Sequence, residues 1–195
     1  MPKPATAQLF ITCLVDSFFP AIGEAIVYML NRAGVCVEFP AMQTCCGQPA
    51  FNAGLRSQAR PLAEHTLKVL ERTTSDIVIP SGSCTAMLRR GYLELFKDDP
   101  RWLARAQTLA GRVYVFTEYL VDVRGICELG SHWPGKLTYH PSCHLLRILG
   151  VDRQPTVSFW PMSEKLKWLN FLNAKNAADL AASSWWNTPK FQQNS

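Results

Sequence analysis

The sequence predicts an α/β protein in which a parallel sheet is covered by helices on both faces. Short runs rich in β-branched residues alternate with longer segments of helical periodicity along most of the chain. The run DIVIP at residues 76–80 is apolar enough to be buried on both faces, as central parallel strands are. Alternation of strands and helices in this order is typical of a sheet with parallel strands.

The strands are expected where short apolar runs end at a turn residue or lead into a helix. QLFIT precedes the first helical segment, Pro40 ends VCVEFP, and RVYVFT leads into EYLVDV. The predicted strands are residues 8–12, 35–40, 76–80 and 112–117, with a further strand, KLTYH, at residues 136–140.

The helices are expected where apolar residues recur at helical spacing. In the first of them Pro20 suits the first turn and Gly34 the C-terminal cap. In the second, Pro61 is expected near a first turn or a kink. The predicted helices are residues 19–34, 54–73, 84–96 and 100–111, and the loop PSCHLLRILG is expected to run into another.

The composition is that of a globular protein without a membrane span. Hydrophobic residues make up 48% of the 195, yet no run of about 18 apolar residues occurs. The apolar N-terminal stretch has only Lys3 ahead of it and is interrupted by Asp16, so we expect no secretory signal and a cytoplasmic location. The net charge of +5 is spread along the chain, which argues against nucleic acid as a partner.

Five of the seven cysteines follow predicted strands. In a chain without an export signal, such cysteines are metal ligands, redox thiols or buried small hydrophobes more often than disulfides. Loops at the carboxyl ends of parallel strands meet at one edge of the sheet, where ligands of open α/β sheets bind. We therefore expect convergence there of Cys13, Cys45, Cys46, Cys84 and Cys143.

The cysteine spacing C-x31-CC-x37-C favours an iron–sulfur cluster over zinc. Thiolate clusters select zinc, copper(I) or iron–sulfur, and structural zinc sites usually use two close CxxC pairs. Adjacent thiolates such as Cys45 and Cys46 diverge, which suits different irons of one cluster better than a single zinc ion. Gly47 and Gly82 are expected to let backbone amides approach the sulfurs and tune the redox potential.

The remaining chemistry-bearing residues favour structural interpretations. Cys36 and Cys127 are expected to be small buried hydrophobes, and His65 a surface residue. His140 and His144, which flank Cys143, are expected to make structural hydrogen bonds rather than to bind metal or carry protons. Glu118 and Asp122, four residues apart, are expected on a solvated face or in a helix cap rather than in a paired-carboxylate site.

Five ordered segments resemble the cysteine-rich CCG-domain iron–sulfur oxidoreductases. This family includes the cysteine-rich component of heterodisulfide reductase, the iron–sulfur component of glycolate oxidase and the lactate utilization proteins, and the resemblance is closest to the last group. It covers roughly residues 7–155 and rests on LFITCLVDSFFPAIGEA, GVCVEFPAMQTCCGQPAFNAG, DIVIPSGSCTAMLR, FTEYLVD and YHPSCHLLRILGV.

The resemblance implies a subunit of a cytoplasmic complex that oxidises L-lactate to pyruvate and passes electrons through iron–sulfur centres. It implies a 4Fe–4S type of cluster and partners that include a further iron–sulfur subunit. Carried over residue by residue, Cys13, Cys45, Cys46 and Cys84 match the first cluster motif, and Cys143 begins a second.

The chain departs from the family pattern in two places. Ser81 stands where heterodisulfide reductase has the first cysteine of a CxxC pair, so one thiolate is replaced by a hydroxyl. No second CCG motif follows Cys143. We therefore expect a first module at residues 1–125, the start of an incomplete second module at 126–157, and an atypical tail at 158–195.

We expect residues after about 157 to be a frameshifted reading of the second motif. With reverse-translated codons read one base earlier, the junctions from Asn176 onward permit Cys-Cys-Gly-Phe-Gly-Gly, and those across 187–192 permit His-Pro-Glu-Ile-Ser. The alternative is an additional C-terminal helix in MSEKLKWLNFLNAKNAADLAA. Sequencing the gene distinguishes the two.

Two other functions compete with electron transfer. The paired thiols could form a disulfide-reducing centre of the heterodisulfide reductase type, or the chain could be a metal-free or zinc-bearing scaffold that only binds partner subunits. No G-x-G-x-x-G follows a strand, so a flavin-dependent step would belong to another subunit.

Overall fold

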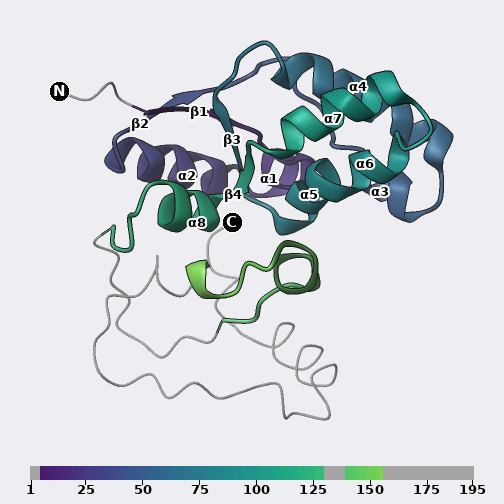
Figure 1. The fold of residues 1–195 in the computed structure, drawn as a ribbon. Coiled ribbons are helices and arrows are strands. Elements are labelled where there is room, and N and C mark those ends of the chain that lie inside the picture. The colour runs from purple at the N-terminus through teal and green to yellow at the C-terminus, as the bar shows by residue number, and fades with distance from the viewer. Residues whose placement is uncertain (1–4, 130–138, 156–195) are drawn as a thin grey trace, which may run out of the picture. The chain divides into compact units, whose positions relative to one another are not determined.

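A four-stranded parallel sheet forms the centre of the computed structural model, which describes residues 5–129 and 139–155 (Figure 1). The strands lie in the order β2-β1-β3-β4, and every neighbouring pair is parallel. Their bounds are β1 Ala5–Leu9, β2 Val35–Glu38, β3 Asp76–Ile79 and β4 Val113–Val115. The predicted parallel α/β architecture is confirmed.

The helices agree with the predicted segments and add short ones between them. Gly34 follows α2 with a φ of 70°, as expected of a C-terminal cap, and Pro61 lies inside α4 rather than in its first turn. The bounds are α1 Cys13–Phe18, α2 Pro20–Arg32, α3 Gln48–Asn52, α4 Arg56–Leu70, α5 Gly82–Ala86, α6 Tyr92–Leu95, α7 Pro100–Ala110 and α8 Phe116–Glu118. Wider π-type turns form η1 Met87–Gly91, η2 Tyr119–Val123 and η3 His144–Leu149.

Two apolar clusters lie on opposite faces of the sheet. Ile77 and Ile79 of β3 pack in one cluster with Leu67 and Leu70 of α4 and with residues of α6 and α7. The intervening Val78 packs in the other cluster, with residues of α2 and η2. Figure 1 shows α2 and α8 on one side of the strands and α4 and α7 on the other. Alternating side chains of one strand thus feed both layers, and β3 is buried on both faces as predicted.

Several predicted segments differ from the structure or lie outside it. The first strand begins and ends three residues earlier than expected, because the segment after Leu9 turns towards α1, which Thr12 caps by accepting a hydrogen bond from the Val15 amide. Of the strand predicted at 136–140, residues 136–138 lie outside the described residues, and Tyr139 and His140 belong to no strand. The tail at 158–195, with its alternative helix, also lies outside the described residues. Within the described ranges, no helix has the length and apolar character that a membrane crossing requires.

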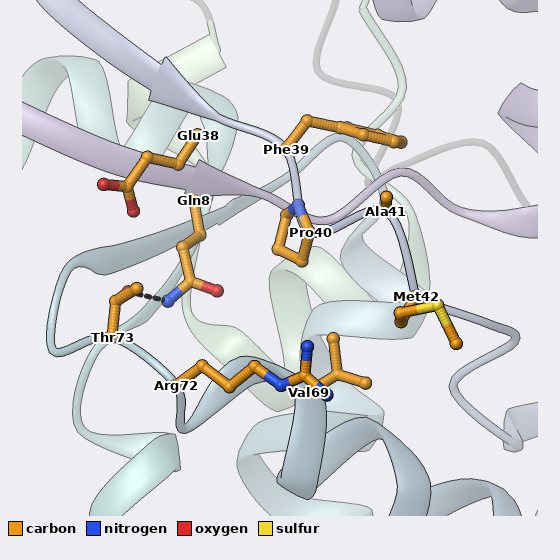
Figure 2. Close-up of a pocket in the computed structure, with 9 residues that line it drawn as sticks. All are labelled: Gln8, Glu38, Phe39, Pro40, Ala41, Met42, Val69, Arg72 and Thr73. Carbon is orange, nitrogen blue, oxygen red and sulfur yellow. Dashed lines mark hydrogen bonds between the residues drawn. The ribbon is translucent and has the colours of Figure 1, made fainter.

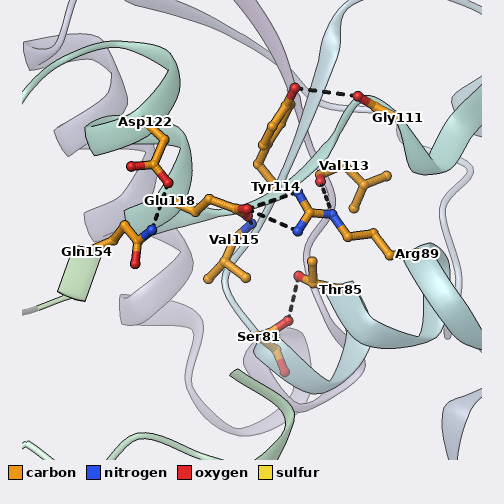
Figure 3. A network of polar contacts seen from close by, with 10 residues as sticks. All are labelled: Ser81, Thr85, Arg89, Gly111, Val113, Tyr114, Val115, Glu118, Asp122 and Gln154. Atoms are coloured by element: carbon orange, nitrogen blue, oxygen red, sulfur yellow. Dashed lines mark hydrogen bonds and ion pairs between the residues drawn. The ribbon is translucent and has the colours of Figure 1, made fainter. Parts of the chain in front are cut away.

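An ion pair that is largely shielded from solvent joins β4 to the helical layer (Figure 3). Both terminal nitrogens of Arg89 donate to Glu118 Oε1 at 3.0 Å, and Arg89 Nε donates to the Val113 carbonyl at 2.6 Å. Glu118 Oε2 accepts a hydrogen bond from the Val115 amide at 3.1 Å, so Glu118 caps α8. A helix cap was one of the two roles predicted for this residue. The other, a solvated face, is wrong for Glu118, whose side chain is only 13% exposed because Arg89 covers it. Asp122 is exposed and accepts a hydrogen bond from Gln154 at 2.7 Å.

Candidate metal centre

The strand order reverses between β1 and β3. The chain leaves β1 through α1 and α2 to reach β2 on one side, and later returns through α4 to β3 on the other side of β1. In open parallel sheets, such a switch point leaves a crevice at the carboxyl ends of the two strands, and ligands bind there. Cys13 begins α1 after β1, and Cys84 lies in α5 directly after β3.

The structure brings four of the predicted cysteines together at this edge. Cys13 Sγ lies 3.9 Å from Cys45 Sγ, and Cys46 Sγ lies 3.4 Å from Cys84 Sγ. The thiols of Cys45 and Cys46 also interact with each other, so the two pairs form one continuous group, and the adjacent thiols do not diverge, contrary to the prediction. Three loops that are far apart in the sequence supply them, as expected from their positions after the strands.

The thiol group runs from the surface into the core. Cys13 is exposed and Cys45 is half-buried, whereas Cys46 and Cys84 are 2% and 7% exposed and belong to the apolar cluster under α4 and α6. One side of the group is therefore open to solvent, and the other is closed by packed side chains.

Hydrogen bonds divide the four thiols into proton donors and acceptors. A hydrogen bond from the Cys46 thiol, helped by the Gly47 amide and by Cys13, lowers the pKa of Cys45 to about 5, although burial opposes the shift. Cys46 also donates to Cys84, which lowers the pKa of Cys84, with the hydroxyls of Ser81 and Ser83 contributing. The pKa of Cys46 is raised because its single thiol proton is held between the sulfurs of Cys45 and Cys84 and because the residue is buried. The thiolate, the form that binds metals, is thus favoured at Cys45, and the pKa of Cys84 is shifted in the same direction.

The thiols are arranged as two pairs rather than as a cage for a single ion. Within residues 5–129 and 139–155, no three histidine, cysteine or acidic side chains are placed to hold one metal ion together. Two thiolates bound to one tetrahedral metal at about 2.3 Å lie about 3.8 Å apart, so the 3.9 Å between the Cys13 and Cys45 sulfurs is the spacing of two ligands on a shared metal atom. The all-sulfur donor set is what the site has in common with iron–sulfur and zinc centres.

Gly47, directly after the cysteine pair, occupies a left-handed conformation and a tight space, both of which favour glycine. Its φ is 82°, and a Cβ there would lie 3.2 Å from the Ala59 carbonyl oxygen and 3.3 Å from Leu62 Cβ. The predicted close backbone approach is therefore present at Gly47, where the loop packs on α4 and the amide reaches the Cys45 sulfur.

Replacement of Gly47 by alanine is expected to lower the free energy of unfolding by about 2 kcal/mol or more, because left-handed backbone costs a side-chain-bearing residue about 1–2 kcal/mol and crowding adds to it. Urea denaturation measures the change. Gly54→Ala is the matched control, because Gly54 has a φ of 77° but nothing within 4 Å of its Cβ position. Equal losses in the two variants would show that crowding at Gly47 contributes nothing.

At Gly82 the missing side chain lets η3, rather than a sulfur ligand, approach the backbone. A Cβ at Gly82 would lie 2.6 Å from Leu145 Cγ, so the glycine makes room for η3 to pack on the start of α5. Ser81, the residue in place of a family cysteine, lies beside the thiols: its hydroxyl is 3.0 Å from that of Ser83 and contributes to the lowered pKa of Cys84. Ser81 is therefore positioned as a hydrogen-bond donor to sulfur.

Two supporting residues were not predicted from the sequence. Gln43 holds the loop before the cysteine pair on β1, because its Oε1 accepts from the Ile11 amide at 2.7 Å and its Nε2 donates to the Leu9 carbonyl at 3.3 Å. Tyr92, which is fully buried, donates its hydroxyl to the Cys46 carbonyl at 2.9 Å. Burial raises the pKa of Tyr92 well above its ordinary value, so it remains a donor.

Tyr92→Phe is expected to lower the free energy of unfolding by about 1–2 kcal/mol, because the Cys46 carbonyl keeps its burial and loses its donor. Chemical denaturation followed by circular dichroism tests this. Tyr28→Phe serves as the control, since Tyr28 is 63% exposed and the change should lie within about 0.5 kcal/mol of zero. A Tyr92→Phe protein as stable as the control would contradict the supporting role.

The other predicted residues lie outside the thiol group. Cys143 is exposed at the start of η3 and joins neither thiol pair among the described residues. His144 Nε2 lies 3.3 Å from Gln48 Nε2, a structural contact of the kind expected, and His140 is exposed. His65 is half-buried and its ring hydrogen-bonds the Met42 carbonyl at 2.7 Å, so it is only partly the surface residue expected.

The predicted burial of Cys36 and Cys127 is wrong, because both are exposed. Cys36 lies on β2, one of the two edge strands of the described sheet, and Cys127 lies in the loop after η2. An alternating apolar pattern indicates a strand but does not show whether a helix covers each of its faces.

Comparison with known proteins shows which class of domain one segment of the chain resembles. Residues 7–89, which include Cys13, the adjacent pair and Cys84, match the CCG cysteine-rich domain. The predicted resemblance to CCG-domain proteins is thus confirmed over the segment that contains the four thiols.

The curated relatives point to a particular group of these proteins. The chain is 43% identical over 156 residues to lactate utilization protein A of Exiguobacterium sp., and 45% identical over 149 residues to lactate utilization protein A 1 of Bacillus cereus and lactate utilization protein A 2 of Bacillus mycoides. These alignments cover 76–80% of this chain but only 62% of each relative, so the chain spans less than two thirds of their length.

Proposed function

We propose that Cys13, Cys45, Cys46 and Cys84 hold an iron–sulfur cluster, and that the chain is an electron-transfer subunit in the oxidation of L-lactate to pyruvate. The observation that supports this most strongly is the meeting of four thiols from three loops at the switch point of the sheet. The names of the relatives support lactate utilization as the setting.

A cluster of the 4Fe–4S type bound there would carry electrons one at a time. The residues of this chain would provide its ligands and set its potential. Hydrogen bonds to sulfur from the Gly47 amide and the hydroxyls of Ser81 and Ser83 stabilise negative charge, which shifts the reduction potential. We propose Cys143 as the first ligand of a second centre, in a module that begins near residue 126, after a first module at 1–125.

An electron carrier must also pass electrons to a partner. Cys13 reaches the surface, so electrons could leave the site on that side without crossing the core. Large apolar side chains on α1 and the start of α2 are exposed close to it in the chain, which is a composition favoured at protein interfaces; they are Leu14, Phe18, Phe19 and Ile22. We propose that a further iron–sulfur subunit of a cytoplasmic lactate-oxidising complex contacts this side.

Iron and sulfide analysis of anaerobically purified protein tests the proposed cofactor. We expect iron and acid-labile sulfide in similar amounts, together with broad visible absorption from sulfur-to-iron charge transfer. A colourless protein that carries one zinc ion, or no metal, would overturn the cluster assignment and leave the scaffold alternative.

A second candidate function, reduction of disulfides, is supported by the short distance between the Cys46 and Cys84 sulfurs and by the low pKa of Cys45. Two nearby thiols could reduce a disulfide substrate by successive exchange, becoming a disulfide themselves while both substrate sulfurs leave as thiols. Iron-free protein that reduces small disulfides, combined with normal growth on L-lactate after deletion of the gene, would favour this alternative. Loss of growth on L-lactate together with no reductase activity would favour electron transfer.

A further inference from the structure

A cleft of about 270 Å³ lies beside the edge strand β2, apart from the thiol group (Figure 2). It is bounded by the ends of β1 and β2, by the loop that follows β2 and by the end of α4 with the residues after it. Typical pockets for drug-sized ligands have volumes of about 300–1,000 Å³. The cleft therefore suits a smaller molecule, of the size of a single amino acid.

Gln8 presents a hydrogen-bond acceptor to this cleft. The residue is only 2% exposed, and its Nε2 donates to the Leu70 carbonyl at 3.1 Å and to Thr73 Oγ1, which fixes the amide plane. Its Oε1 has no partner among the residues that the structure describes. Figure 2 shows this oxygen directed away from Thr73, towards the side of the cleft formed by Pro40 and Met42. The oxygen reaches the cleft and is not sealed from solvent, so an N–H or O–H group of a ligand can take the place of water there.

Two opposite charges lie on either side of Gln8. Arg72 makes no hydrogen bond or ion pair with any residue in the described ranges, and Glu38 accepts only a long hydrogen bond, 3.4 Å, from Ser75. Figure 2 shows Glu38 and Arg72 on opposite sides of the Gln8 amide. A molecule that bridges them needs a cationic donor at one end and an anionic acceptor at the other.

The remainder of the cleft is apolar. Phe39 and Met42 in the loop after β2 are 58% and 59% exposed, and Val69 of α4 closes the floor. Covering this exposed apolar surface with a ligand side chain removes it from water, which contributes favourable free energy to binding. The ligand should therefore combine a zwitterionic head with a short apolar side chain.

We propose that this cleft binds a small apolar α-amino acid. The carboxylate pairs with Arg72, the ammonium group donates to Gln8 Oε1 and lies near Glu38, and the side chain covers Phe39 and Met42. This site is independent of the thiol group and of any centre bound there.

L-Leucine is the probe, titrated into the full chain and followed by calorimetry or by NMR shifts. We expect saturable binding. We expect binding to weaken at least about tenfold for 4-methylpentanoate, which lacks the ammonium group, for 3-methylbutylamine, which lacks the carboxylate, and for 2-hydroxy-4-methylpentanoate, which replaces the ammonium with a neutral donor.

Variants localise the effect. Arg72→Gln and Glu38→Gln should each weaken L-leucine binding about tenfold, whereas Arg101→Gln, an exposed residue outside the cleft, should bind as the parent does. Circular dichroism verifies that each variant is folded. Absence of L-leucine binding, binding of the hydroxy acid as tight as that of L-leucine, or parental binding by Arg72→Gln would each overturn the proposal.

Discussion

Replacement of Cys46 by serine is expected to remove iron and sulfide from the protein if the four thiols are the proposed ligands. Cys46 is the innermost of the four thiols and lies 3.4 Å from Cys84, so the substitution removes a sulfur from the buried part of the group. Loss of a residue outside the ligand set typically costs about 10–100-fold in metal affinity, and loss of a ligand should cost at least as much. Iron, sulfide and visible absorption after anaerobic purification measure the effect.

Two further variants make the result interpretable. Cys13→Ser removes an exposed thiol of the same group, so it should lose the cluster without a large effect on folding. Cys36→Ser removes an exposed thiol on β2 that lies outside the group, and it should retain parental iron and sulfide. The proposed ligand set would be wrong if Cys46→Ser and Cys13→Ser kept their iron, or if Cys36→Ser lost it.

Glu118→Ala is expected to lower the free energy of unfolding by about 3 kcal/mol or more. The substitution leaves Arg89, whose side chain is 19% exposed, without its acid, and it removes the acceptor of the Val115 amide (Figure 3). Removal of one partner from a buried ion pair typically costs about 3–5 kcal/mol. Urea or thermal denaturation of the iron-free protein measures it.

The matched control for this prediction is Glu94→Ala. Glu94 also pairs with an arginine, Arg56, at 2.8 Å, but the two side chains are 59% and 46% exposed. Ion pairs in water contribute about 0–1 kcal/mol, so the control should lose little. Similar losses in the two variants would show that the Arg89–Glu118 pair is no more important than a surface pair.

The sequence predicted the sheet because its strands have a strong local signal. Ile77, Val78 and Ile79 form an uninterrupted apolar run, and such a run is stable only when helices cover both faces of the strand. The helices α2, α4 and α7 carry repeated apolar positions over several turns, which is also a local signal. The helices α1 and α3 are too short for such periodicity, and local contacts such as the Thr12 cap determine them.

The positions of the four thiols could be predicted from topology alone. Parallel strands carry their following loops to one edge, so residues after β1, β2 and β3 meet there whatever their spacing in the chain. The support of the site could not be predicted in this way. Tyr92 reaches the Cys46 carbonyl from a helix 46 residues later, and no motif marks that contact.

The errors arise from the same source. Cys36 has the apolar neighbours of a core residue, yet β2 is an edge strand and leaves it exposed. Glu118 has the spacing of a solvated helix face, yet Arg89 from another helical segment covers it. Burial of a side chain depends on which helices and strands pack against it, and the local pattern of apolar residues in the sequence does not contain that information.

Because the four thiols are buried to different degrees, reagents in solvent reach them in a fixed order. Water, oxidants and chelators meet Cys13 and Cys45 first, while packing around Tyr92 shields Cys46 and Cys84. Oxidation or chelation of a metal centre held there would consequently start at the sulfurs of Cys13 and Cys45, and the bonds to Cys46 and Cys84 would be the last to break.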